Sequence, residues 1–225
     1  MDPALASLIA ASIAFVGTHF LLSHPLRAPL VRALGATGFM LLYSLVAFAT
    51  LWWMVLAFGD ATGSFLGGSG PVGWAIATVL TLPAMILLLG SFAGNPALPA
   101  PGAEQAARKE PAGVFRVTRH PMMWSFALWA IAHIALWWSW RTNVVALAIL
   151  VLALVGAHLQ DGKKEALMGE AWKDWESRTS YWPRWRNLRH APAWVIAVGI
   201  VAWLAATYAH IHIGNVPAGI WRWIG

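Results

Sequence analysis

Six long apolar stretches, separated by short polar segments, dominate the chain. Each is close to the roughly 20 residues that an α-helix needs to cross a hydrocarbon core about 30 Å thick. Proline or glycine stands near most of the boundaries, as at Pro25 and Gly70-Pro71, because one lacks the amide donor and the other relaxes the backbone. The pattern predicts an all-α, polytopic membrane helix bundle with about six transmembrane helices, forming one domain over 1–225, at 3–24, 36–59, 71–93, 120–139, 142–160 and 191–213.

Two of the connecting segments are long enough to hold structure of their own. Residues 94–115 are rich in Pro, Ala and Gly and predict an irregular connector. Residues 163–178 predict an amphipathic helix lying along the membrane surface, because apolar side chains recur at helical spacing on one face. That face carries Leu167, Met168, Ala171, Trp172 and Trp175.

Composition agrees with a membrane protein and its charge pattern sets the orientation. Of 225 residues, 59% are hydrophobic and 11% charged, whereas a soluble domain has about 25% charged residues. With six spans, 13 of the 15 Lys and Arg residues fall in loops on one side. Cytoplasmic loops carry this excess, so we expect both termini in the periplasm, in a cell inner membrane. The +6 net charge comes from basic residues that gather in the loops on one side of the membrane. We therefore expect the lipid bilayer as partner and no nucleic acid.

The chain has eight histidines and no cysteine. Disulfides, thiolate metal sites and covalent c-type haem are therefore excluded. Histidine at membrane depth invites a functional explanation, and His19 and His133 are placed deepest in their spans. Each is either a ligand of haem iron or another metal, or a hydrogen-bonding residue between helices. His210 and His212, two apart at the outer end of the last span, point to different faces, so we expect surface residues there and no paired site.

A second group of polar residues lies near the predicted inner boundary. It contains His24, His120 and His158 and several arginines, among them Arg27, Arg116 and Arg119. Arginine pairs carboxylate or phosphate groups through two parallel hydrogen bonds, so the group suits an anion such as haem propionates or a phosphate. Alternatively, these side chains extend singly to the membrane surface. Of nine acidic residues, only Asp60 and Asp161 touch the ends of spans.

Two segments carry a resemblance to a known family. Thr18-His19-Phe20-Leu21-Leu22-Ser23-His24-Pro25-Leu26-Arg27 resembles the first-helix signature of the NnrU family of bacterial membrane proteins. The segment from Arg116 through Arg119-His120-Pro121 to Ala132-His133 is similar to that family's longest motif, and Gly156-Ala157-His158 to Thr179-Ser180 fits the segment after it. The family is in turn similar to 15-cis-zeta-carotene isomerase, a membrane enzyme with haem b.

This resemblance implies haem b, with His19 and His133 as axial metal ligands and His120 and His158 in supporting positions. It also implies a link to denitrification, through nitrite or nitric oxide reduction with a redox partner or denitrification enzymes, or a redox-dependent isomerisation of an apolar polyene. A non-catalytic accessory factor for denitrification is the alternative. Arg119-His120-Pro121 with the later acidic segment is also similar to S-adenosylmethionine-dependent membrane methyltransferases of the isoprenylcysteine carboxyl type, although Lys164 replaces one of their paired glutamates.

Overall fold

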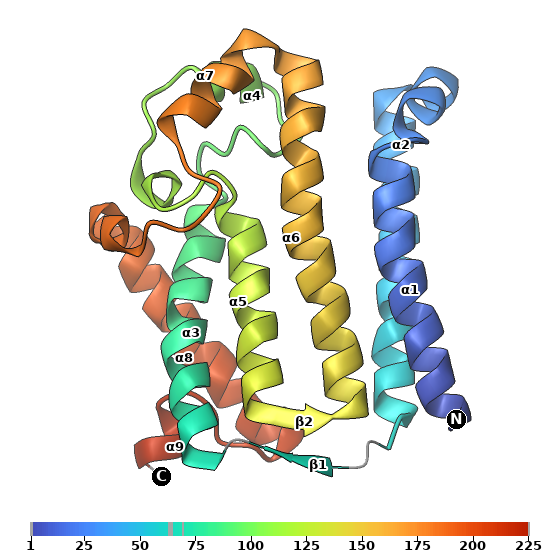
Figure 1. Ribbon diagram of the computed structural model, residues 1–225, viewed down its shortest axis with the longest axis vertical. Helices are drawn as coiled ribbons and strands as arrows, with labels where there is room; N and C mark the ends of the chain where they lie inside the picture. Colours follow the sequence, from blue (N-terminus) through green and yellow to red (C-terminus); the bar gives the residue numbers. More distant parts are fainter. Residues whose placement is uncertain (1, 63–64, 69, 225) are drawn as a thin grey trace.

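The computed structural model describes residues 2–62, 65–68 and 70–224 and is nearly all-α (Figure 1). Its elements in chain order are α1 (Pro3–Ser23), α2 (Arg27–Asp60), β1 (Phe65–Gly68), α3 (Gly70–Gly90), α4 (Ala103–Ala107), η1 (Gly113–Arg116), α5 (Pro121–Leu136), β2 (Trp137–Ser139), α6 (Trp140–Met168), α7 (Glu170–Arg178), η2 (Trp185–His190), α8 (Ala193–Gly214) and α9 (Trp221–Ile224). Within the described ranges, β1 and β2 form one small antiparallel sheet.

Five of these helices are long and apolar enough to cross a membrane, namely α1, α2, α3, α6 and α8. The sixth expected span, 120–139, is the shorter α5 of 16 residues, which reaches about 24 Å at 1.5 Å per residue. It ends early because residues 137–139 form β2, which pairs with β1. The chain is thus a multi-pass membrane protein, and both termini lie at the same end of the bundle (Figure 1), as an even number of crossings requires.

The helices are arranged around two packed cores. In the larger one α3 packs on both α5 and α8, and α5 packs on α6. In the smaller one α1 packs on α2 and on α6; its buried cluster includes Leu8 and Phe15, and Val144 and Ile149 of α6 pack against that cluster. The contact of α3 with α8 is close, because a Cβ at Gly199 would lie 2.7 Å from a side-chain carbon of Ile86. Side chains that face away from these cores are large and apolar, as contact with lipid demands.

The predicted amphipathic helix exists with different bounds and surroundings. Its first residues belong to α6, which continues to Met168, and Gly169 with φ +55° breaks the helix before α7 starts. Trp172 and Trp175 on the apolar face are fully buried in the larger core. This part of the apolar stripe therefore packs on the protein itself, beyond the start of α5 (Figure 1), whereas Leu167 is exposed. The connector 94–115 is irregular as expected, apart from the short α4 and the start of η1.

Helix α2 starts before the predicted span. Its first turns lie in the segment predicted to be a loop, and Gly35 with φ +71° interrupts the helix between them and the long apolar part. A residue with a side chain is strained in this left-handed region. The interruption separates the basic start of α2, with Arg27 and Arg32, from the part that can cross the membrane.

Candidate functional site

The segment before α5 is held in place by the chain after α7. The backbone N–H of Arg119 donates to the carbonyl of Ser180 at 2.8 Å. The carbonyl of Tyr181 accepts from the Thr118 hydroxyl and from the indole Nε1 of Trp124, each at 2.8 Å. These bonds join residues about 60 positions apart in the sequence, so they fix the first turn of α5 against the chain that follows α7.

Asp161 of α6 joins the Arg-His pair in a buried ionic network. Arg119 donates from Nε to Oδ1 at 3.0 Å and from Nη2 to Oδ2 at 2.6 Å, and Nε2 of His120 contacts Oδ1 at 2.8 Å. The Arg119 and Asp161 side chains are 14% and 13% exposed, and that of His120 is fully buried. A two-pronged pair between guanidinium and carboxylate is strong and geometrically specific. Breaking it leaves a charge without its partner inside the protein, which is costly.

Glu176 of α7 adds a second carboxylate to this network. Its Oε1 lies 3.3 Å from Nη2 of Arg119. Burial, and then the negative charge of Asp161, raise the pKa of Glu176 above its ordinary value. Burial also raises the pKa of Tyr181, whose ring lies 5.6 Å from the Arg119 guanidinium. Since Asp161 has both of the closest contacts, Glu176 is the weaker partner of the arginine.

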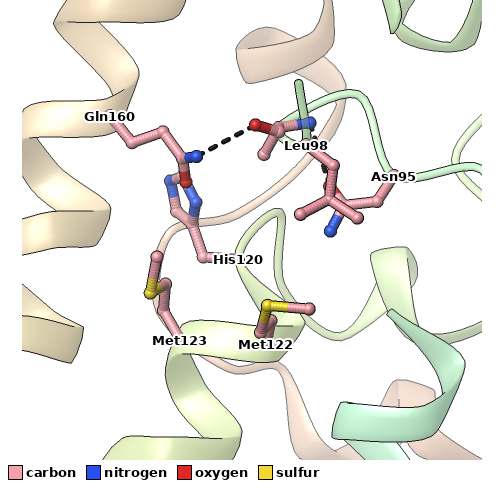
Figure 2. A pocket seen from close by; sticks show the side chains of 7 residues that line it. Asn95, Leu98, His120, Met122, Met123 and Gln160 are labelled. Carbon is pink, nitrogen blue, oxygen red and sulfur yellow. Dashed lines mark hydrogen bonds between the residues drawn. The ribbon is translucent and has the colours of Figure 1, made fainter. Parts of the chain in front are cut away.

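The loop after α3 covers a small cavity beside this network (Figure 2). Figure 2 shows Gln160 of α6 donating from Nε2 to the carbonyl of Ala97 at 3.0 Å. The ammonium of Lys164, one turn further along α6, donates to the carbonyls of Pro96 and Leu98 at 3.0 and 3.3 Å. These two side chains attach the loop to α6.

His120 lines the cavity together with two methionines of the first turn of α5, Met122 and Met123 (Figure 2). Among the described residues, Nδ1 of His120 has no hydrogen-bond partner. The cavity measures about 20 Å³, and a water needs roughly 10–15 Å³. A water bound to Nδ1 fits this space. A nucleotide-sized cofactor such as S-adenosylmethionine does not fit this cavity.

His19 lies on α1, and one of its ring nitrogens is hydrogen-bonded to the backbone of the same helix. Its Nδ1 is 2.7 Å from the carbonyl of Phe15, one turn earlier, and a carbonyl only accepts, so Nδ1 carries the proton. The lone pair then belongs to Nε2, the tautomer of a ligating histidine whose other nitrogen is held by a carbonyl. The ring is half-buried, and it meets the edge of the Tyr43 ring on α2 at 5.5 Å.

His133 on α5 repeats this arrangement. Its Nδ1 lies 2.8 Å from the carbonyl of Trp129, and the two rings are 4.1 Å apart between centroids. Its Nε2 is likewise the nitrogen with the lone pair. His210 of α8 has the same local contact, with its Nδ1 2.7 Å from the carbonyl of Ala206.

The structure does not bring His19 and His133 to the same depth. His19 is 16 residues from the start of α1 at Pro3, which is about 24 Å along the helix. His133 is three residues before the end of α5 at Leu136, which is about 5 Å from the same end of the bundle. Phe20, next to His19, accordingly lies beside Gly156, deep into α6. The two imidazoles are therefore nearly 20 Å apart in depth, and α6 packs on the helices of both.

The remaining predicted site residues lie in three different places. Arg27 is at the start of α2, with its guanidinium 5.8 Å from the centre of the Phe39 ring. Arg116 is exposed and donates from Nε to the carbonyl of Pro111 at 3.0 Å. His158 is exposed on α6. Of the predicted group near the inner boundary, Arg119 and His120 meet in one site, where both contact Asp161.

Comparison with known proteins decides the family. The chain matches the model of the NnrU protein family over residues 7–218, which is nearly its whole length. The chain belongs to the NnrU family. No curated protein and no solved structure matches it.

Sequence reasoning missed two members of the ionic network in this NnrU-family chain. Asp161 and Glu176 were not predicted as site residues, yet both contact Arg119. A signal for the first was present, because Asp161 is one of only two acidic residues that touch the end of an apolar stretch. No comparable signal marked Glu176, which sits among other charged residues of α7.

His19 and His133 were predicted to bind one haem iron, but the structure keeps the two side chains apart. Each has an aromatic ring beside it and, among the described residues, an Nε2 that is not hydrogen-bonded; a neutral imidazole of this kind can bind haem iron. Their difference in depth prevents both from ligating one iron in this arrangement. Across the part of the chain that is described, no three His, Cys, Asp or Glu side chains group as a metal site.

Proposed function

We propose that this NnrU-family protein is a membrane redox protein that binds haem b and supports nitrite or nitric oxide reduction. The observation that carries the proposal is His133. Its Nδ1 is held by a backbone carbonyl, its Nε2 is free, and it lies on a helix packed between two others. Haem ligation through Nε2 needs the tautomer in which Nδ1 carries the proton, and the Trp129 carbonyl favours that tautomer.

Bound haem would supply one-electron redox chemistry. The chain's own residues would hold the iron through Nε2 of His133 and surround the macrocycle with apolar side chains. The Trp129 carbonyl keeps the imidazole in the ligating tautomer and fixes its ring direction. Arg119 and His120, at the opposite end of the bundle, already contact Asp161. We therefore assign them to that network and not to the haem.

Haem content of the purified protein tests the proposal. The full chain is produced with haem supplied, purified in detergent, and assayed for haem b per chain and for its visible spectrum. We expect a stoichiometry near unity, and His133→Ala should lose the haem or change the spectrum. His212→Ala is the matched control, because His212 lies near the same end of the bundle beside Tyr208. A folded wild-type protein without haem contradicts the proposal.

The link to denitrification rests on family membership and has its own test. A denitrifying host that lacks its NnrU-family protein is complemented with this chain, and nitrite and nitric oxide consumption are measured. We expect wild-type protein to restore consumption and His133→Ala to fail at equal membrane abundance. Restoration by His133→Ala would favour the non-catalytic accessory factor instead.

A further inference from the structure

The histidine that lines the small cavity at the start of α5 has one ring nitrogen without a partner. His120 is fully buried, and its Nε2 contacts Oδ1 of Asp161 at 2.8 Å. A carboxylate only accepts hydrogen bonds, so Nε2 carries the proton, and a neutral imidazole then has its lone pair on Nδ1. Among the described residues, Nδ1 has no hydrogen-bond partner. Since Asp161 does not line the cavity, Nδ1 is the polar atom that His120 can offer to an occupant.

The pairing of this histidine with a carboxylate is the arrangement that orients ligating imidazoles at metal sites. A carboxylate that accepts from one ring nitrogen fixes the tautomer and the ring direction, and it makes the other nitrogen a stronger donor. Asp161 is itself held by two hydrogen bonds from Arg119, at 3.0 and 2.6 Å, which positions the ring of His120 further. A buried acceptor without a partner is costly, so an occupant that binds Nδ1 would stabilise the protein.

The other side chains around the cavity indicate the chemistry of that occupant. Figure 2 shows the side chains of Met122 and Met123 lining the same space as the imidazole, with the amides of Asn95 and Gln160. Thioethers are soft ligands that select Cu(I), whereas Mg²⁺ and Ca²⁺ prefer carboxylate, carbonyl and water oxygens. The cavity measures about 20 Å³, and one water needs roughly 10–15 Å³. It therefore has room for one bare ion and not for an ion with its hydration shell.

We propose that this cavity binds one Cu(I) ion through Nδ1 of His120 and the thioether sulfurs of Met122 and Met123. The three donors are neutral, so the charge of the ion must be balanced nearby. The adjacent network does this when Glu176 is ionised, because it then holds two carboxylates against the single guanidinium of Arg119. The site lies at the end of the bundle opposite to the chain termini (Figure 1). It goes beyond the proposed haem function and does not depend on it.

Anaerobic titration of the purified full chain in detergent with Cu(I), in competition with a chromophoric chelator, tests the proposal. We expect one Cu(I) per chain. His120→Gln keeps an amide donor for Asp161 and loses Nδ1, and Met122→Leu and Met123→Leu each remove one sulfur at nearly constant volume. Each variant should lower the Cu(I) affinity by more than about tenfold. Met168→Leu is the matched control, because Met168 packs on the larger core and does not line the cavity, and it should keep the wild-type affinity.

X-ray absorption of the copper-loaded protein identifies the ligands. The proposal predicts a cuprous edge and a shell of one nitrogen and two sulfur scatterers. Folded wild-type protein that binds no Cu(I) contradicts it and leaves a water as the occupant. Unchanged affinity in both cavity-methionine variants, or a shell of nitrogen alone, places the copper elsewhere, for example at the exposed His210 and His212, and also overturns it. His120-dependent binding of Zn²⁺ that is tighter than that of Cu(I) would refute the choice of ion. Absence of haem from the same sample contradicts the proposed function alone.

Discussion

Replacement of Asp161 by alanine should destabilise the protein more than any surface charge change. The substitution removes the carboxylate from Arg119 and His120, whose side chains are 14% and 0% exposed. Removing one partner of a buried ion pair costs about 3–5 kcal/mol. Because Glu176 remains 3.3 Å from Arg119, we expect the low end, about 3 kcal/mol. At about 2–4 °C per kcal/mol for a chain of this size, the Tm should fall by about 6–12 °C.

Thermal unfolding of the detergent-solubilised protein, followed by loss of the monodisperse species, measures this effect. The matched control is Asp174→Ala, which removes a carboxylate that is 57% exposed and pairs with Arg178 one turn away. An exposed pair of this kind is worth about 0–1 kcal/mol, or less than about 4 °C. Asp161→Asn should fall between the two, because the amide oxygen still accepts a hydrogen bond. Equal Tm values for Asp161→Ala and Asp174→Ala would refute the reasoning.

Three further predictions concern packing, pH and topology. Gly199→Leu should lower the Tm strongly, because the α3 backbone leaves no room for a side chain there, whereas Gly17→Ala, with open space around it, should not. The raised pKa of Glu176 means that its folded state prefers the protonated form. Stability should therefore decline as pH rises through that pKa, and Glu176→Gln should flatten this part of a Tm-versus-pH curve; parallel curves would contradict this. Since the chain has no cysteine, Asp2→Cys should react with an impermeant thiol reagent on intact cells, and Asp174→Cys only after the inner membrane is opened. The reverse labelling pattern would invert the proposed orientation.

The apolar pattern predicted most of the helices, because residence in lipid imposes both length and composition on a span. It did not predict where α5 ends, since residues 137–139 are as apolar as the helix before them and leave it only to pair with β1. The pattern also predicted that the amphipathic helix starts at residue 163, whereas α7 starts at Glu170. The spacing of Trp172 and Trp175 marks a buried face correctly, but it cannot distinguish burial in lipid from burial against the protein.

The sequence likewise predicted some residues of the candidate site but not the contacts between them. The residue types of the Arg119-His120 pair marked a polar site at one end of the bundle, and the structure places a network there. The partner of that pair, Asp161, is 41 residues from His120 in sequence, and only the packing of α5 on α6 joins them. For the histidines, counting residues from the helix ends already separates His19 from His133 in depth.

The claim that this protein binds haem is tested most directly by a reduced-minus-oxidised visible difference spectrum. The sample is the full chain, purified in detergent after production with haem supplied and shown to be monodisperse. The account predicts a Soret band that shifts and sharpens on addition of dithionite, with the changes lost or altered in His133→Ala. A featureless difference spectrum from the folded wild-type protein would contradict it.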